Sequence, residues 1–409
     1  MIHVCFSLHD KTGRYSKFTG TTILSIFENT NSEVTAHILH DNTLTAENRD
    51  KFIYLAGRYG QLVKFYNVEE LCADKISEIL NFAPEVKNAY VSIGTFYRLL
   101  IPQIIPSDVD KIIYLDSDII VKLDIKELWQ INLGDKILAA VPEILSSSEK
   151  EMQERFPLCS YNFVRCEDYF NGGVLVINLN LLRGEEKILT EALQLCSQNP
   201  HMRNFFDQDI LNFCFSTKAL KLPTTFNRFT RIARIENESL EKKIYHYAGN
   251  FFMCGLGLEL HDPFNRLWMN YFINSPWFDT DSIARLYDDV RQIYNNLKKD
   301  MVNLSAATSG KIRAFIIFEE ELDKFVEVFS VKEGEEVFVV KNGTPLKNII
   351  EPMNSSNGEK IFFIMLPEFP FNLLTEAGFV QGKDFLNVYD FLSEEHGQPL
   401  RSYHLLKKM

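Results

Sequence analysis

Short apolar runs alternate with amphipathic helical segments along the first third of the chain. The runs have the length and composition of strands and occupy residues 2–8, 34–39, 62–66 and 111–116. Between them, residues 17–28 and 45–59 carry apolar side chains at a spacing of three to four, and Thr45 suits the N-cap of the second segment. Strand–helix–strand units of this kind predict an α/β fold with a mostly parallel sheet and helices on both faces.

Two carboxylates one residue apart, Asp116 and Asp118, end the last of these apolar runs. In an extended segment such residues point to the same side, and their charges repel unless a cation lies between them. Hard divalent ions such as Mg²⁺ or Mn²⁺ prefer oxygen ligands and are often shared with substrate phosphates. A plain turn or a solvated strand end is one alternative. A phosphatase nucleophile is another, although that pattern favours Thr or Val after the second Asp, where this chain has Ile119.

Composition restricts the class of protein further. A chain of 409 residues predicts two domains, and a hydrophobic content of 46% is sufficient for a packed core. A formal net charge of −12 disfavours nucleic acid as a partner. The start of the chain is not expected to be a signal peptide, and no run approaches 18 uninterrupted apolar residues. The seven cysteines are scattered without the spacing of a zinc site or a disulfide framework. A reducing cytoplasm fits best. No glycine-rich nucleotide loop is present, so a metal is expected to neutralise any bound diphosphate.

Three further segments combine polar and apolar residues in patterns that suggest a site. Residues 169–178 place Gly172 and Gly173 before a buried strand, which permits close backbone approach to a ligand, although a plain turn is the alternative. Residues 206–212 open a helical pattern with acidic side chains, which the helix dipole alone also favours. His246 lies in an aromatic strand, where a histidine is more often part of the core than a ligand.

The four motifs Tyr-Leu-Asp-Ser-Asp-Ile, Phe-Asn-Gly-Gly-Val-Leu-Val-Ile-Asn, Asp-Gln-Asp-Ile-Leu-Asn and His-Tyr-Ala-Gly occur in this order between the N-terminus and about residue 275. In this combination the chain resembles the retaining glycosyltransferases of family 8, which include bacterial lipopolysaccharide galactosyl- and glucosyltransferases and glycogenin. The resemblance implies a GT-A type fold, a UDP-sugar donor, an active-site Mn²⁺ with Mg²⁺ as the alternative, and a glycan or glycolipid acceptor such as lipopolysaccharide. The donor hexose, glucose or galactose, stays open.

The resemblance also implies roles for individual residues. The metal ligands would be Asp116, Asp118 and His246. The donor-binding residues would be Ser7, Asp10, Tyr15, Arg98, Asp116, Ser117, Asn171, Gly172, Asp207, Gln208 and Gly249. The catalytic candidates would be Gln208, Asp207 and Asp209. For Arg98 a buried structural ion pair is the alternative. A histidine ligand favours Mn²⁺ over Mg²⁺. Retention is compatible with a double displacement and with attack on the same face of the sugar, of which we favour the second.

One departure from the family pattern affects the expected activity. Bacterial relatives often carry a lysine for the diphosphate after the histidine motif, and this chain has Phe252 at that position. A catalytically inactive member that binds a sugar nucleotide or a partner is therefore an alternative. A sugar nucleotidyltransferase is a third hypothesis, but it needs a glycine-rich basic loop, whereas residues 7–15 contain the single glycine Gly13 and two basic residues, Lys11 and Arg14.

The chain changes character towards its C-terminus. We predict a GT-A catalytic domain at 1–277, a polar helix and linker at 278–311, and a small α/β accessory domain at 312–409. In the accessory domain strands are expected at 312–318, 337–340 and 361–366, with helices at 320–329 and 371–378. Glutamates at 319–321 stand where a nucleotide-binding version would need glycines, which favours an architectural or partner-binding role. The protein is expected in the cytoplasm, with peripheral contact at the inner face of the membrane as an option, and its oligomeric state stays open.

Overall fold

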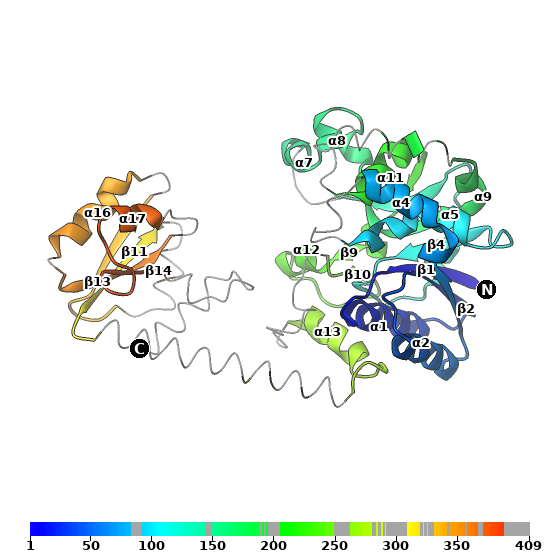
Figure 1. Cartoon of the computed structure of the whole chain (residues 1–409), viewed down its shortest axis with the longest axis horizontal. Coiled ribbons are helices and arrows are strands. Elements are labelled where there is room, and N and C mark those ends of the chain that lie inside the picture. Colours follow the sequence, from blue (N-terminus) through cyan, green and yellow to red (C-terminus); the bar gives the residue numbers. More distant parts are fainter. Residues whose placement is uncertain are drawn as a thin grey trace. The chain divides into compact units, whose positions relative to one another are not determined.

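The chain packs as two compact units, Met1–Ile283 and Ala284–Met409. The computed structural model describes residues 1–82, 92–143, 149–185, 205–248, 262–279, 309–319, 331–341, 344–356, 358–366 and 371–387, together with single residues between some of these ranges. Figure 1 labels the main elements of both units.

A seven-stranded sheet in the order β3-β2-β1-β4-β7-β6-β8 forms the centre of the first unit. Its strands are β1 (Ile2–Leu8), β2 (Val34–His40), β3 (Leu62–Asn67), β4 (Lys111–Leu115), β6 (Leu138–Pro142), β7 (Phe170–Asn178) and β8 (Ala219–Lys221). The half from β3 to β4 is parallel, whereas β7 runs antiparallel to both β4 and β6. The sheet is therefore mixed but mostly parallel, as predicted, and the carboxyl ends of β1, β2 and β4 meet at one edge.

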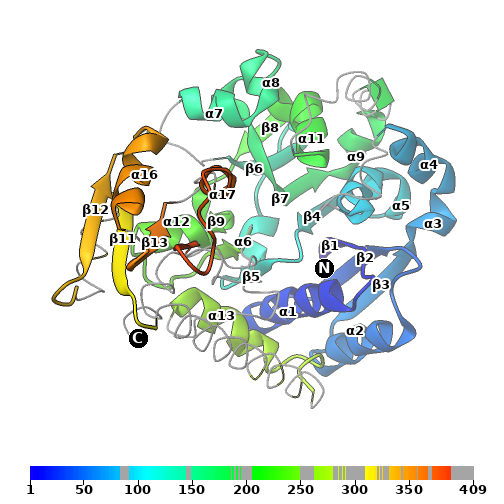
Figure 2. The same ribbon diagram turned by 60° about the vertical axis from the view of Figure 1, so that its left-hand side comes forward.

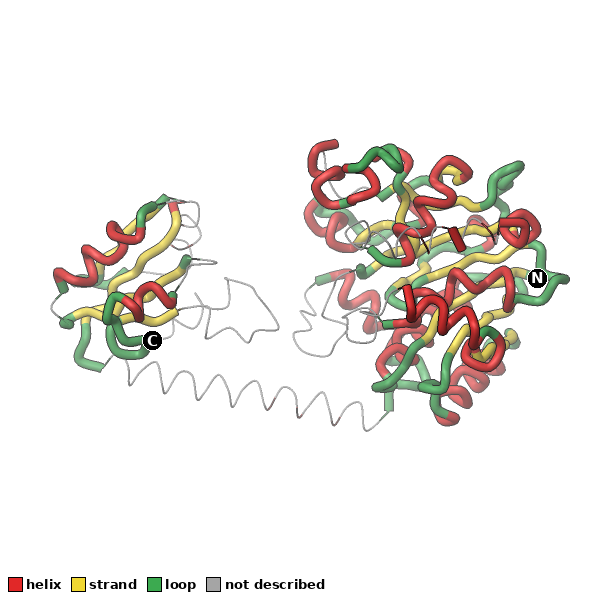
Figure 3. Tube along the Cα trace, turned by 45° about the horizontal axis from the view of Figure 1, so that its top comes forward, coloured by secondary structure: helices red, strands yellow, loops and turns green. Residues whose placement is uncertain are grey.

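Helices cover both faces of this sheet because alternate strand residues point to opposite sides. On one face α1, α2 and α13 pack against Val4 and Phe6, and on the other α4, α5 and α11 pack against Cys5 and Tyr114. Figure 1 labels these six helices, and Figure 3 shows red helices on both sides of the yellow strands of the first unit. The helices are α1 (Arg14–Asn29), α2 (Ala46–Arg58), α3 (Val68–Leu71), α4 (Ala73–Phe82), α5 (Ile101–Ile104), α6 (Lys126–Trp129), α7 (Glu149–Arg155), α8 (Pro157–Ser160), α9 (Leu179–Leu182), α11 (Asp207–Phe215), α12 (Thr230–Ile235) and α13 (Pro263–Phe272). Short 3₁₀ segments are η2 (Ile93–Leu100), η3 (Cys166–Asp168), η4 (Arg183–Glu185), η6 (Ser216–Lys218) and η7 (Thr224–Phe226).

A second, three-stranded sheet brings distant parts of the first unit together. It has the order β5-β10-β9, formed by β5 (Ile119–Val121), β10 (Ile244–His246) and β9 (Arg228–Phe229). Strand β10 pairs antiparallel with β5, and the register sets His246 opposite Ile119. Figure 2 shows β5 and β9 on the same side of the first unit. This sheet therefore carries His246 to the residues that follow β4.

The strands and helices predicted for the first third of the chain are confirmed. Strand β1 has the predicted bounds, and helix α2 begins after Thr45, whose side chain accepts a hydrogen bond from the Asn48 backbone N–H. One prediction needs correction, because β4 ends at Leu115, and residues 116–118 form a bend before β5. Asp116 and Asp118 therefore lie in a turn between two strands that belong to different sheets.

The second unit has its own parallel sheet in the order β12-β11-β13-β14. Its elements are β11 (Ile312–Phe318), β12 (Glu336–Val340), α16 (Leu346–Ser355), β13 (Lys360–Met365), α17 (Asn372–Glu376) and β14 (Phe385–Asn387). Apolar clusters pack on both faces of β11 and β13. The strands expected here and the helix near 371–378 are confirmed. Most of the helix predicted at 320–329 and of the polar helix and linker at 278–311 lies outside the described residues.

Two expectations drawn from composition concern cysteines and the membrane. The described cysteines Cys5, Cys72, Cys159, Cys166 and Cys214 are free thiols. In the described part of the chain, no helix combines the length and the apolar character that crossing a membrane requires.

Candidate metal and sugar-nucleotide site

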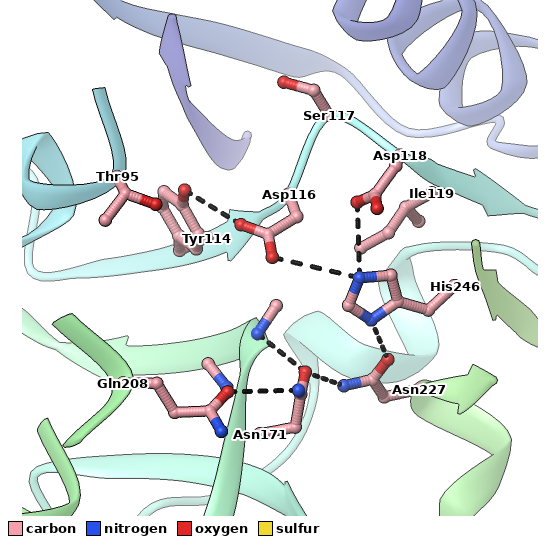
Figure 4. A network of polar contacts seen from close by, with 12 residues as sticks. Thr95, Tyr114, Asp116, Ser117, Asp118, Ile119, Asn171, Gln208, Asn227 and His246 are labelled. Atoms are coloured by element: carbon pink, nitrogen blue, oxygen red, sulfur yellow. Dashed lines mark hydrogen bonds and ion pairs between the residues drawn. The ribbon is translucent and has the colours of Figure 1, made fainter. Parts of the chain in front are cut away.

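The bend after β4 and the small sheet together bring two carboxylates to one imidazole. Ligand atoms of Asp116, Asp118 and His246 all lie within 4.8 Å of one another. The Nε2 atom of His246 is 3.2 Å from Asp118 Oδ1 and 3.9 Å from Asp116 Oδ2 (Figure 4). Two backbone hydrogen bonds hold the bend, from Asp116 N to the Gly173 carbonyl and from Tyr247 N to the Asp118 carbonyl. The three ligands predicted from the motifs are therefore brought together.

The two carboxylates of the cluster face one histidine, and Arg98 lies beside Asp116. Burial alone would lower the pKa of His246, but Asp118 and then Asp116 raise it. Burial likewise opposes ionisation of Asp118, yet the neighbouring His246 holds the pKa of this carboxyl below its ordinary value. Two carboxylate oxygens and one imidazole nitrogen form a ligand set that suits Mn²⁺ better than Mg²⁺. The residues present therefore fit a divalent cation.

Gly173 makes this convergence possible. A Cβ atom on Gly173 would lie 2.4 Å from His246 Cε1 and 2.9 Å from Asp116 Oδ2, closer than packed atoms approach. Both Gly172 and Gly173 lie inside β7, so the alternative that they form a plain turn before the strand is wrong. The close approach that the glycines permit is to the side chains of the site.

Arg98 connects the Asp116–Asp118–His246 cluster to the start of helix α11. Its Nη2 is 2.8 Å from Asp116 Oδ1, and its Nη1 donates to the Gly172 carbonyl at 2.6 Å. Its Nε lies 2.7 Å from Asp207 Oδ2 as an ion pair without hydrogen-bond alignment. Burial opposes the charge of Arg98, but Asp116 and Asp207 outweigh it and raise the pKa of the guanidinium. The ion pairs that we gave as the alternative role of Arg98 are therefore present, and its contact with a donor stays a prediction.

Helix α11 presents the three catalytic candidates in different environments. Phe206, the residue before the helix, has φ 46° and ψ −111°, an unusual conformation that sets the direction in which α11 begins. Burial raises the pKa of Asp207 to about 7, and Arg98 opposes that rise. Asp209 accepts hydrogen bonds from Tyr169 Oη at 2.6 Å and from Phe205 N at 2.7 Å. Because Asp209 is fully buried and both its oxygens are engaged, its geometry is that of an anchor for α11.

Gln208 and Asn171 belong to a network of amides beside the cluster. Gln208 Oε1 accepts from Gly172 N at 2.9 Å and from Asn171 Nδ2 at 3.1 Å. Two members of this network were missed at the sequence level, Glu143 and Asn227, both buried. Glu143 Oε2 accepts from Asn171 Nδ2 at 2.8 Å, and Asn227 bridges Asn171 and His246. Their sequence signal is weak, because each is a single polar residue in an ordinary loop or strand end.

The residues predicted near the N-terminus lie around the start of α1. Asp10 is buried and accepts from Tyr15 N at 2.9 Å, from Asn48 Nδ2 at 3.3 Å and from Ser16 Oγ. The carboxylate of Asp10 thus holds the loop before α1, whereas the Tyr15 side chain is 44% exposed. The Oγ of Ser7 is buried.

Other predicted donor contacts are placed less favourably or not described. Ser117 Oγ lies 2.8 Å from Thr19 Oγ1 and points away from the cluster toward α1 (Figure 4). Gly249 and Phe252 lie outside the described residues. The effect of the missing lysine therefore stays a prediction.

A second histidine–aspartate pair, not predicted from the sequence, follows β1 and β2. Asp41 accepts from Tyr97 Oη at 2.6 Å, from Thr43 N at 2.9 Å, from Thr43 Oγ1 and from His9 Nδ1. Burial opposes the charge, but these hydrogen bonds outweigh it and lower the pKa of Asp41. Asp41 is therefore an ionised carboxylate whose two oxygens accept hydrogen bonds, and it lies at the same edge of the sheet as the Asp116–Asp118–His246 cluster.

Comparison with known families matches this architecture. The model of glycosyl transferase family 8 matches residues 7–251, which include all the residues of the cluster. The chain belongs to glycosyltransferase family 8. A putative glycosyltransferase of Haemophilus influenzae is 29% identical to this family 8 member over 246 residues, 58% of this chain and 68% of the relative. A lipopolysaccharide 1,2-glucosyltransferase of Escherichia coli is 30% identical over 277 residues, 64% of this chain and 76% of the relative.

A solved structure supports the fold of this family 8 member. The galactosyltransferase LgtC, solved in complex with donor and acceptor sugar analogues, is similar with a TM-score of 0.52 and 21% sequence identity. The match covers 68% of this chain and 98% of LgtC. The first unit therefore has the GT-A type fold that the motifs predicted.

Proposed function

We propose that the protein is a retaining hexosyltransferase that uses a UDP-sugar donor and Mn²⁺. The Asp116–Asp118–His246 cluster carries this proposal, because two carboxylates and one imidazole converge there as a ligand set suited to a divalent cation. Membership of family 8 and the similarity to a lipopolysaccharide 1,2-glucosyltransferase support a hexose donor and a lipopolysaccharide or other surface-glycan acceptor.

The expected place of action is the cytoplasm, at or near the inner face of the membrane. The domain division at 277/278 and 311/312 is part of the same proposal, with the last domain in an architectural or partner-binding role.

The charges around the cluster suit a diphosphate leaving group. Asp116, Asp118 and His246 would hold Mn²⁺, which when bound supplies Lewis-acid stabilisation of the negative charge on the departing diphosphate. Arg98 places a second positive charge beside Asp116, fixed by its hydrogen bond to the Gly172 carbonyl. Since Phe252 stands at the position of the family lysine, we assign Arg98 a larger share of the phosphate neutralisation.

The face of β7 and α11 would bind the donor sugar. Asn171, Gly172 and Gln208 meet there through hydrogen bonds that fix the orientation of both amides. Asp207, held by Arg98, would accept from sugar hydroxyls. Ser7, Asp10, Tyr15, Ser117 and Gly249 complete the predicted donor contacts, and the engagement of Asp10 and Ser117 with α1 favours indirect roles for these two.

We favour attack of the acceptor on the same face of the sugar from which the diphosphate leaves. A double displacement would need a nucleophile, and Asp209, the candidate for that role, is fully buried and accepts hydrogen bonds from Tyr169 and Phe205. Gln208 is a neutral amide and a poor nucleophile. In this mechanism Gln208 and Asp207 position the sugar, and a donor phosphate oxygen takes the acceptor proton.

Donor hydrolysis tests the proposal directly. UDP-glucose, UDP-galactose and UDP-N-acetyl sugars would be incubated with the protein in Mn²⁺ or in EDTA, and UDP release would be measured. We expect Mn²⁺-dependent release from one donor, reduced at least about 100-fold in Asp118→Ala. The control is Glu127→Ala, which removes an exposed acidic side chain shortly after the same bend.

A protein that hydrolyses none of these donors would contradict the proposed transferase. If no donor is hydrolysed but one of them raises the melting temperature with Mn²⁺, the inactive, nucleotide-binding member replaces the transferase. If neither hydrolysis nor stabilisation occurs with any donor, the sugar-nucleotide site itself is refuted.

A further inference from the structure

The two ring nitrogens of His246 face different partners. Nε2 faces Asp118 and Asp116, as described above, whereas Nδ1 lies 2.9 Å from Asn227 Oδ1. Both residues are buried, and the ring of Phe229 lies 5.2 Å from the imidazole, which limits rotation. An imidazole binds a metal only through a nitrogen without a proton, so the proton of the neutral ring must sit on the other nitrogen. Asp118 and Asp116 favour a proton on Nε2, whereas the partner of Nδ1 can draw that proton to the other nitrogen and leave Nε2 with a lone pair for a cation.

Backbone N–H groups fix which end of the Asn227 amide faces His246. Gly173 N donates to Asn171 at 2.9 Å, and since a backbone N–H can only donate, the atom of Asn171 that receives it is the oxygen. The Asn227 atom at 2.8 Å from this oxygen must then be the nitrogen Nδ2. The other end of the Asn227 amide, its oxygen, is left to face His246.

The far end of the network gives the same assignment. Gly172 N donates to the oxygen of Gln208, and that oxygen and Glu143 Oε2 both accept from Asn171 Nδ2. Asn171 therefore has its oxygen toward Asn227 and its nitrogen toward Glu143 and Gln208, with no donor–donor conflict along the chain of amides. The dashed lines in Figure 4 follow this path from Gln208 through Asn171 and Asn227 to His246.

We propose that Asn227 is a positioning residue that holds the proton of His246 on Nδ1 and thereby keeps Nε2 available for the metal. The inference rests on the metal site of the proposed function. Partners that orient a metal-binding histidine in this way commonly change metal affinity 10- to 100-fold when they are removed. The amide network extends the effect to Asn171 and Gln208, so the metal ligand and the donor-facing amides share one hydrogen-bond pattern.

The experiment compares Asn227→Leu with two other variants of the full-length protein. Asn227→Leu keeps the size of the side chain and removes the acceptor, whereas Asn227→Asp retains an acceptor for Nδ1–H. Asn265→Leu is the matched control, because Asn265 is also buried and its Oδ1 accepts from Arg234 at 2.8 Å. Two readouts are needed, the ¹⁵N spectrum of His246 in metal-free protein at a pH above the titration of this ring seen in the same spectra, and the Mn²⁺ dissociation constant from paramagnetic resonance without nucleotide.

We expect a larger share of the Nδ1–H form in the wild type and in Asn227→Asp than in Asn227→Leu. Mn²⁺ affinity should fall about 10- to 100-fold in Asn227→Leu and stay within about twofold in Asn265→Leu. The inference is overturned by an Asn227→Leu protein that keeps the tautomer ratio of the wild type, or by one that keeps its Mn²⁺ affinity. A wild type that binds no Mn²⁺ refutes the metal of the proposed function, and the spectra then decide the role of Asn227 alone.

Discussion

The same edge of the first sheet carries two pairs of aspartate and histidine, and they differ in how their carboxylates are satisfied. The carboxylate of Asp41 is 2% exposed and accepts from His9, Tyr97 and Thr43. The side chains of Asp116 and Asp118 are 25% and 32% exposed and face each other across His246. We call His9–Asp41 the closed pair, because donors from the protein surround its buried carboxylate. We call Asp118–His246, with Asp116 beside it, the open pair, because its carboxylates are partly exposed and can accept a cation as well as their protein partners. Residue type alone therefore does not separate a structural pair from a binding site.

The largest effect is expected when a methyl group enters the open pair. Gly173→Ala would place Cβ 2.4 Å from His246 Cε1 and 2.9 Å from Asp116 Oδ2, so the ligands cannot converge. We expect Mn²⁺ affinity to fall at least about 100-fold. Titration with Mn²⁺ followed by paramagnetic resonance measures this.

A glycine beside the closed pair provides the matched control for Gly173→Ala. A Cβ on Gly94 would lie 2.8 Å from His9 Cβ, so Gly94→Ala also displaces a histidine of a pair. It should destabilise the fold by about 1–3 kcal/mol and leave Mn²⁺ affinity within about twofold. Equal losses of metal affinity in the two variants would contradict the distinction between the pairs.

Asp41→Asn should reveal the closed pair as a source of stability. The amide cannot accept all the hydrogen bonds that the carboxylate receives, and we expect a loss of about 2 kcal/mol in the free energy of unfolding at pH 7. Because folding lowers the pKa of Asp41, its contribution is complete above the ordinary carboxyl value of 3.8 and is lost as the pH falls below that value. Denaturant unfolding of both proteins at several pH values tests this.

The difference between wild type and Asp41→Asn should therefore shrink in acid. A difference that stays constant between neutral pH and a pH well below 3.8 would show that the charge of Asp41 is not what stabilises the pair. Mn²⁺ affinity at neutral pH should be unchanged in Asp41→Asn, since the open pair has its own ligands.

The smallest expected effect comes from one hydrogen bond of the closed pair. Tyr97→Phe removes the donor that lies 2.6 Å from Asp41 Oδ2 while other donors to this carboxylate remain. We expect a loss of about 1 kcal/mol in the free energy of unfolding. The exposed residue Tyr54 provides the control, because Tyr54→Phe should leave stability unchanged. If Tyr97→Phe and the wild type have equal stabilities, the hydrogen bonds from His9 and Thr43 alone stabilise the carboxylate of Asp41.

Local patterns predicted the fold well. The period of apolar residues identified β1, β2 and β3 closely, and the N-cap preference of Thr45 located the start of α2. The bend after β4 was not predicted, because Ile119–Val121 is as apolar as the strand before it. Residues 119–121 join the second sheet because they pair with β10, which lies far from β5 along the chain.

The site could be predicted where residue type specifies chemistry, and not where geometry does. The motifs predicted Asp116, Asp118 and His246 as metal ligands, and the structure brings these three side chains together. They did not identify Asn227, because its contact with Asn171 joins residues 56 positions apart through the fold. Nor could they indicate that the Ser117 side chain turns toward α1, since side-chain direction in a bend follows from its packing.

Strand β10 also determines when during synthesis the metal site can be completed. The ribosome releases β4 and the bend long before β10, so the growing chain carries Asp116 and Asp118 without His246. The third ligand arrives only when Ile244–His246 pairs with Ile119–Val121. An unfinished polypeptide thus lacks His246, and the proposed metal site is complete only after most of the first unit has emerged.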